Sequence, residues 1–147
     1  MKMKRGIQEE RQLARLFWKR GFAVMRAPAS GASTQMPRPD IVTGNSEKGV
    51  QFAIEVKTTN SDKLYIAHES IRQLLDFSQL FGCKPILALK FKGKSRSWLF
   101  IMPKYLALTP SLNYKITFIE ALRIGMDFKT LIKEGKQAEI PFLKEKK

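Results

Sequence analysis

The sequence predicts a single α/β domain in which helices flank a central β-sheet. Residues 7–20 and 69–81 both have helical periodicity, and a glycine, Gly21 or Gly82, follows each of them. Residues 85–91 form a nearly continuous apolar run of strand length, which is typical of a strand buried on both faces. A chain of 147 residues is long enough for one domain with a sizeable core.

The other elements follow from alternating apolar residues and from turn residues. Strands are expected at residues 22–26, 38–42, 52–57, 64–66, 97–101 and 115–118, with a short helical turn in 103–108 and a short helix over 127–134 that Asp127 caps. Residues 45–49 supply the turn between the second and third strands. The loop over residues 27–38 is rich in Pro, Ser, Gly and Thr and is longer than a tight connection needs, which is typical of functional loops.

The composition indicates a polyanionic partner. The chain carries 27 Lys and Arg against 13 Asp and Glu, a formal net charge of +14, so nucleic acid is the first candidate and an anionic membrane surface is the rival. No apolar run approaches the roughly 18 residues of a spanning helix, and the basic N-terminus lacks the apolar stretch of a signal peptide. We therefore expect a cytoplasmic protein. Cys83 is the sole cysteine, which excludes an intrachain disulfide and a cysteine metal site.

The first helix carries charged residues on two faces. At roughly 100° per residue, Glu10 points in the direction of the apolar stripe and Glu9 toward the edge of the sheet. An inward carboxylate must be paired, hydrogen-bonded or bound to a metal, so Glu10 is either a metal ligand or the partner of Lys57 or an arginine. The opposite face carries a row of cations, Arg11, Arg15 and Lys19, which either meets phosphates or is merely solvated.

The second and third strands bring acids and a lysine together. Glu55 and Lys57 share one strand face, about 7 Å apart along the strand, while Phe52, Ile54 and Val56 share the other. Asp40, on the neighbouring strand, completes a pocket of two carboxylates and one lysine. Such a pocket suits a hard divalent cation such as Mg²⁺, which prefers oxygen ligands and keeps several waters.

These residues resemble a known enzyme superfamily. Pro39-Asp40, followed fifteen residues later by Glu55-Val56-Lys57, resembles the motif of the PD-(D/E)xK nucleases. The run over residues 21–31, with 39–42, 54–57, 64–66, 75–78 and 88–91, resembles the archaeal Holliday junction resolvases. The likeness covers residues 6–101 of the single domain 1–147, and the extension 103–147 matches loosely, so its role is open.

The resemblance implies a restriction-endonuclease-like fold with a central mixed β-sheet flanked by helices. It assigns catalytic roles to Glu10, Asp40, Glu55 and Lys57, with the three acids as ligands of Mg²⁺. In some members a loop serine also takes part, and that position matches Ser30 here. The resemblance further implies a homodimer with two active sites on a flat basic face. We expect no small-molecule cofactor.

The second helix bears on the homodimer independently. Its apolar residues spread over roughly 220° of the helical wheel, wider than the roughly 100° stripe that one buried face requires. Either the helix is enclosed within its own domain or it forms a dimer interface. Phe77 and Leu80, on the far side, favour the dimer.

Phosphodiester hydrolysis explains why these residue types are needed. A metal ion neutralises charge at phosphorus and generates hydroxide near neutral pH. The adjacent carboxylates favour the charged form of Lys57, so we assign it an electrostatic role, orienting water or stabilising the phosphorane, rather than that of a general base.

Three hypotheses remain open from the sequence. The first is a metal-dependent endonuclease of DNA recombination and repair that binds four-way junctions as a homodimer and resolves them by paired symmetric nicks. The second is a nuclease of the same fold acting on ordinary duplex or damaged DNA. The third is a DNA-binding module without catalysis, whose acids merely pair with lysines. In each case DNA contacts are expected from Lys4, Arg5, Arg11, Arg15, Arg26, Ser30 and Arg38.

Overall fold

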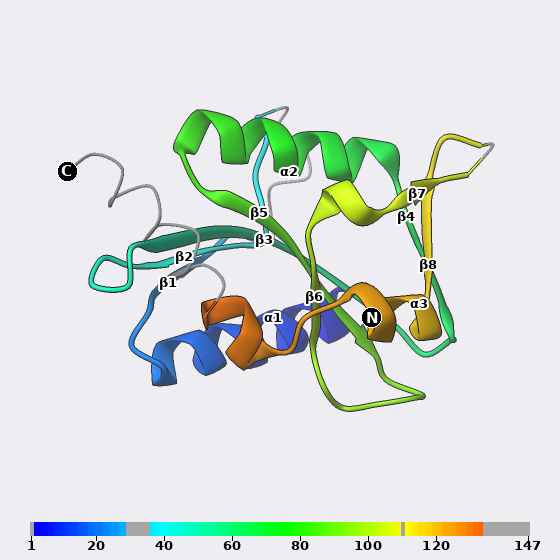
Figure 1. Ribbon diagram of the computed structural model, residues 1–147, viewed down its shortest axis with the longest axis horizontal. Coiled ribbons are helices and arrows are strands. Elements are labelled where there is room, and N and C mark those ends of the chain that lie inside the picture. Colours follow the sequence, from blue (N-terminus) through cyan, green and yellow to red (C-terminus); the bar gives the residue numbers. More distant parts are fainter. Residues whose placement is uncertain (1, 29–35, 110, 134–147) are drawn as a thin grey trace.

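The computed structural model of the protein describes residues 2–28, 36–109 and 111–133, and only the backbone of residues 2–5. A five-stranded mixed sheet lies between helix α1 (Lys2–Lys19) on one face and helix α2 (His68–Phe81) on the other (Figure 1). Across the sheet the order is β1 (Ala23–Arg26), β2 (Ile41–Asn45), β3 (Val50–Thr59), β5 (Lys84–Phe91) and β6 (Leu99–Ile101).

The direction of the strands follows from their connections. The short turn after β2 makes β2 and β3 an antiparallel hairpin, as the sequence predicts, with Gly49 at a φ of 68°. β3 and β5 are parallel, because α2 carries the chain back across the sheet between them. The sheet is therefore mixed, and the predicted fold class is confirmed.

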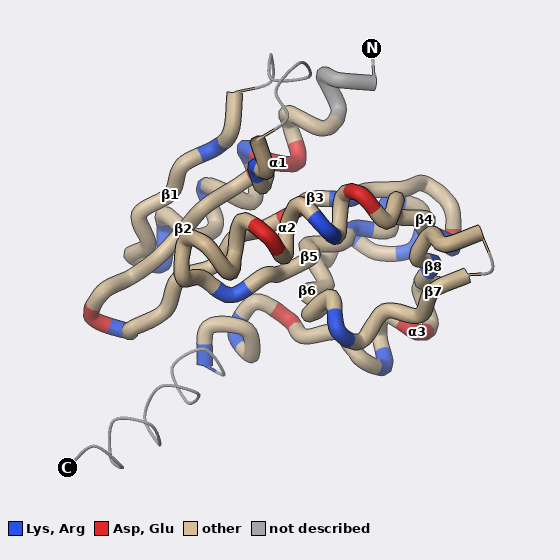
Figure 2. The backbone as a smooth tube through the Cα atoms, turned by 90° about the horizontal axis from the view of Figure 1, so that it is seen from above, with Lys and Arg blue, Asp and Glu red and all other residues tan. Residues whose placement is uncertain are grey.

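A second, smaller sheet stands at one end of the molecule. Its strands are β4 (Lys63–Ile66), β8 (Tyr114–Thr117) and β7 (Ala107–Leu108), in this order, all antiparallel. The 3₁₀ turn η1 (Pro103–Tyr105) precedes β7, and helix α3 (Phe118–Ile124) follows β8. In Figure 2 this sheet lies beside the main sheet rather than continuing it.

Two apolar clusters hold the layers together. On the α1 side, the fully buried ring of Phe17 contacts four other aromatic rings, those of Phe22, Phe52, Phe100 and Phe128. On the α2 side, Ile71 and Leu74 pack in a cluster with Leu87 and Leu89 of β5. β5 contributes side chains to both clusters, which confirms the prediction of a strand buried on both faces.

The sequence prediction misses one helix in the last third of the described chain. Helix α3 was not expected there, because residue 118 was assigned to the preceding strand. The missed signal is the capping box Thr117-Phe-Ile-Glu120, in which Thr117 Oγ1 accepts from the Glu120 amide at 3.2 Å and Glu120 Oε1 accepts from the Thr117 amide at 3.1 Å.

Smaller differences lie at element ends. α1 begins at Lys2 rather than at residue 7, and the expected helical turn over 103–108 is divided between η1 and β7. The expected cap at Asp127 is confirmed, because its Oδ1 accepts from the Thr130 amide at 2.7 Å and residues 128–133 are helical. Within the described ranges, no helix combines the length and apolarity that crossing a bilayer requires.

Candidate active site

Asp40 directly precedes β2, at the end of the hydrogen-bonded ladder between β2 and β3. The β2–β3 ladder begins at Ile41, and one residue earlier the Asp40 amide still donates to Ile54 O at 3.0 Å. Beyond this bond the Asp40 side chain itself pairs with β3, since its Oδ2 accepts from the Val56 amide at 2.8 Å. A carboxylate held by a backbone N–H in this way has a fixed position beside the free edge of β3.

Glu55 and Lys57 project from the same face of β3, as the alternation along the strand predicts. Val56 and Ile54 pack instead in the core on the α1 side. Lys57 Nζ lies 3.4 Å from Glu55 Oε2, and the two side chains are 32% and 15% exposed. The ammonium group thus faces solvent more than the carboxylate that it contacts.

Glu10 reaches the same region from α1. Its Oε1 lies 3.7 Å from Nη2 of Arg26, the last residue of β1, and its side chain is 19% exposed. The structural partner considered for Glu10 is therefore an arginine rather than Lys57. The Nε of Arg26 is buried without a hydrogen-bond partner in the described part of the chain, so this guanidinium retains an unused donor beside the acids.

The acids perturb one another electrostatically. The pKa of Glu55 is raised from 4.5 to about 7, first by burial and then by the nearby Asp40 charge, against the opposing effect of Lys57. Glu10 adds a smaller increase in the pKa of Glu55. A carboxyl group that titrates near neutrality in a partly open site is a frequent property of functional sites.

The pKa values of the other two acids, Asp40 and Glu10, are also raised. Burial raises the pKa of Asp40, while the Val56 amide and the Lys57 charge oppose the increase. The pKa of Glu10 is also raised, first by burial and then by Asp40, with Arg26 opposing. Burial is thus the first cause of the raised pKa of all three acids, and the charges of neighbouring acids add to it at Glu10 and Glu55.

The site fits a hard divalent cation through its donor set, which consists of carboxylate oxygens whose mutual repulsion a cation would relieve. Within the described ranges, no three or more Asp, Glu, His or Cys side chains lie close enough together to form a complete metal cage. Asp40 and Glu55 are the residues that could hold the ion directly, and Glu10 could do so through water, since Mg²⁺ keeps several of its waters.

The other residues selected from the sequence are distributed around this site. Arg11 and Arg15 are exposed on α1, and Arg38 is half-buried two residues before Asp40. Ser30 lies outside the described residues, and the side chains of Lys4 and Arg5 are likewise not described.

The sequence interpretation missed a second charged group next to the site. Glu9, expected at the sheet edge, is only 14% exposed and contacts Lys90 Nζ at 3.5 Å and Lys92 Nζ at 3.2 Å. Lys90 donates further to Gln12. The available signal was Lys90 itself, a lysine inside an otherwise apolar buried strand, which requires a buried partner.

Comparison with known proteins gives one consistent family. Residues 1–140 match the family model described as archaeal Holliday junction resolvase (hjc). A Methanocaldococcus jannaschii protein named crossover junction endodeoxyribonuclease Hjc is 40% identical over 140 residues, 95% of each chain. One of the same name from Archaeoglobus fulgidus is 40% identical over 112 residues, 76% of this chain and 78% of its own.

A solved structure agrees with the sequence relatives. The structure of Archaeoglobus fulgidus Hjc, described as a Holliday junction resolvase from an archaeal hyperthermophile, superimposes with a TM-score of 0.74 at 32% identity. The match covers 84% of this chain and 96% of that one.

Proposed function

The chain belongs to the archaeal Holliday junction resolvase family, and we propose that it is an endonuclease that binds four-way DNA junctions as a homodimer and nicks two strands symmetrically. The cluster of Asp40, Glu55 and Glu10 beside Lys57 carries the proposal, because a protein that only binds DNA gains nothing from three carboxylates near phosphates. Two-fold symmetry of a homodimer would supply two equivalent cuts.

Each residue of the cluster has a role that its position supports. Asp40 and Glu55 would hold Mg²⁺, with Glu10 completing the set through water. When bound, the ion would neutralise the negative charge that builds at the phosphorus and would activate the attacking water. Lys57, next to Glu55 and more exposed than it, would orient that water or stabilise the phosphorane.

Arg26 would bind the phosphate beside the cut. Its side chain is 28% exposed and its Nη2 lies 3.7 Å from Glu10 Oε1, so a partly exposed cation stands beside the acids, where a phosphate would lie. We assign further DNA contacts to Lys4, Arg5, Arg11, Arg15, Arg38 and Ser30. Cytoplasmic location stays a prediction from the sequence.

A cutting assay tests the proposed function. The protein is incubated with Mg²⁺ and either a mobile four-way junction or a linear duplex of matched sequence. Paired nicks at symmetric positions in the junction alone are expected. Equal cutting of the duplex would instead support the more general nuclease, and binding of either DNA without product would support a module that lacks catalysis.

The proposed homodimer has a suitable apolar surface at the end of α2. Leu80 is 86% exposed and Phe81 58%, and Met25 of β1 is 76% exposed. Phe81 also lines a shallow hollow together with residues of β1 and β2, Met25 among them. Apolar side chains gathered in this way on a soluble protein typically mark an interface.

Replacing Leu80 with glutamate is expected to weaken the dimer at least about 30-fold, since loss of a central interface residue costs about 2 kcal/mol or more. Sedimentation at micromolar concentration should then show a mass near 16.9 kDa instead of twice that value. Ile119→Glu is the matched control, because Ile119 is 71% exposed on α3, away from this surface. Equal masses for the two variants would place the dimer contact elsewhere.

A further inference from the structure

A hollow lies between α1 and β5, on the side of the helix away from Glu10. Its lining side chains come from one face of α1 and from the end of β5: Gln8, Glu9, Arg11, Gln12, Arg15 and Lys90. Glu9 and Glu10 are consecutive, so the helix presents one acid to the candidate active site and the other to this hollow. The two sites are therefore adjacent but separate.

Glu9, the acid that lines the hollow, forms ion pairs with two lysines. Glu9 contacts both Lys90 and Lys92, and the buried Lys90 ammonium also lies over the Trp98 ring, 4.9 Å from its centroid. A buried ion needs such partners to offset its lost hydration. The interior of the hollow is thus a fixed network with an excess of positive charge, and it ties α1 to β5 and to the segment before β6.

The turn between β5 and β6 extends the positive surface outward. Its backbone is ordered, since the amides of Lys94 and Ser95 each donate to Phe91 O at 2.9 Å. The turn also packs against the end of β3, because a Cβ on Gly93 would come within 2.6 Å of Asn60 O. The strand that carries Glu55 and Lys57 therefore supports this turn directly.

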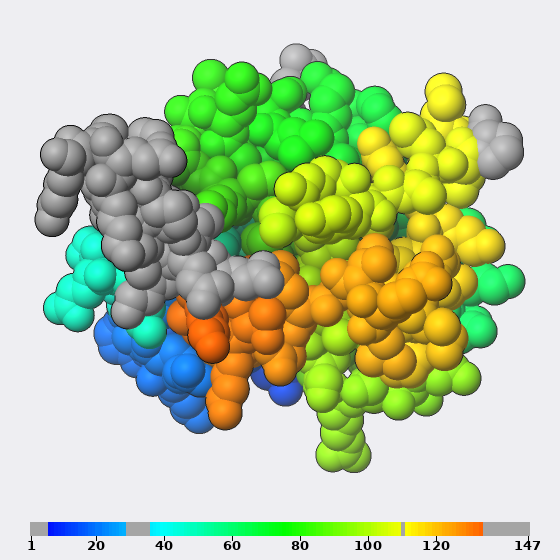
Figure 3. Space-filling view, viewed as in Figure 1, coloured from blue at the N-terminus to red at the C-terminus, as the bar shows by residue number. Residues whose placement is uncertain are grey.

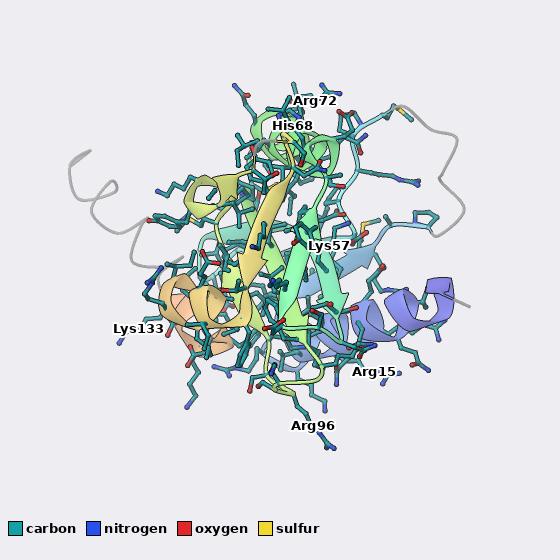
Figure 4. The ribbon with its side chains drawn as sticks, turned by 90° about the vertical axis from the view of Figure 1, so that its right-hand side faces the viewer. Arg15, Lys57, His68, Arg72, Arg96 and Lys133 are labelled. Carbon is teal, nitrogen blue, oxygen red and sulfur yellow. The ribbon has the colours of Figure 1, made fainter. Side chains whose placement is uncertain are left out.

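Two cations that line the hollow, Arg11 and Arg15, and two cations of the β5–β6 turn, Lys94 and Arg96, have no acidic partner among the described residues. Arg15 and Arg96 project from the same side of the molecule in Figure 4. The β5–β6 turn protrudes from the lower edge of the space-filling view (Figure 3). Unpaired cations on a rigid, protruding support suit a chain of phosphates rather than a single small anion.

We infer that this α1/β5–β6 surface is a second phosphate-binding site that holds the backbone of a DNA arm outside the cutting centre. The inference rests on the proposed function and extends it by Lys94 and Arg96. Arg11 and Arg15 contact phosphates from the helix side, and Lys94 and Arg96 contact them from the turn. The contact is to the backbone, so it anchors DNA without reading its sequence.

The double variant Lys94→Gln/Arg96→Gln tests this site. Its affinity for a four-way junction should fall about tenfold, and the slope of log affinity against log salt should become shallower by about 1.8, because each phosphate contact contributes about 0.9. The cutting rate at saturating junction should stay within about twofold of the wild type. Lys94→Arg/Arg96→Lys should restore both the affinity and the slope.

The matched control is Lys129→Gln/Lys133→Gln, which removes the same net charge from exposed positions of the helical segment 128–133. Lys133 lies on a different side of the molecule from Arg15 and Arg96 (Figure 4). An unchanged slope in the first variant, or an equal change in the control, would overturn the second site. Failure of the wild type to cut any junction would instead overturn the proposed function.

Discussion

Glu55→Gln is expected to lower the rate of strand cutting by about 10²–10³-fold while junction binding is retained. Glutamine keeps the shape of the side chain but removes the charge that a metal ion requires, and loss of one preorganised electrostatic group typically costs about 10²–10³ in rate. Binding should persist, because the variant loses a negative charge near the phosphates and no cation.

Single-turnover cutting and a gel-shift titration with the same junction would measure the two effects separately. Glu69→Gln is the matched control, since Glu69 is 56% exposed on α2, where it pairs with Arg72. We expect it to cut like the wild type. Cutting by Glu55→Gln at a rate near that of the wild type would show that the acid cluster is not the catalytic centre.

The same substitution should stabilise the metal-free protein at high pH. The folded state holds the pKa of Glu55 at about 7 against an ordinary 4.5, mainly through burial. A group whose pKa is raised by folding favours the folded state while it is protonated and loses this contribution as pH rises through the folded pKa. Ionised Glu55 therefore destabilises the metal-free fold, and glutamine does not.

The difference in unfolding free energy between Glu55→Gln and the wild type should grow from near zero at pH 4 to about 3 kcal/mol at pH 8. A tenfold change in a proton equilibrium corresponds to about 1.4 kcal/mol. Urea unfolding in EDTA at each pH measures this difference. A constant difference from pH 4 to pH 8 would contradict the raised pKa.

Adding Mg²⁺ at pH 8 should make the wild type more stable than Glu55→Gln. If the ion binds the folded wild type through Glu55 and Asp40, as proposed, that fold should gain stability with the logarithm of the ion's concentration, whereas the glutamine variant should gain less. At pH 5 the gain of the wild type should shrink, because protons compete for the same oxygens. Thermal unfolding with and without Mg²⁺ at the two pH values tests this.

Most of the main sheet could be predicted from the sequence, for a physical reason. Strong local signals, such as the glycines after α1 and α2 and the apolar run of β5, agree there with the packing around them. The failure at α3 has the opposite cause. Phe118 on its own favours a strand, but the capping box makes Thr117 the N-cap, so helix α3 begins at Phe118.

The candidate site could be predicted in its members but not in its contacts. Periodicity places Glu10 inward and alternation places Glu55 next to Lys57, yet neither can show that Arg26 is the partner of Glu10. That pairing depends on how β1 lies against α1, which is a tertiary feature. The network of Glu9 with Lys90 and Lys92 was missed for the same reason, because its partners are about 80 residues apart.

The tryptophan beneath Lys90 has an optical consequence. Trp98 is only 8% exposed and lies in contact with a cation, whereas Trp18, the other tryptophan, is 70% exposed on the outer side of α1. In a Trp18→Phe protein, emission would come from a single indole at the junction of helix, strand and turn. Its wavelength and intensity would then follow the clamping of a DNA arm in real time, with no attached dye.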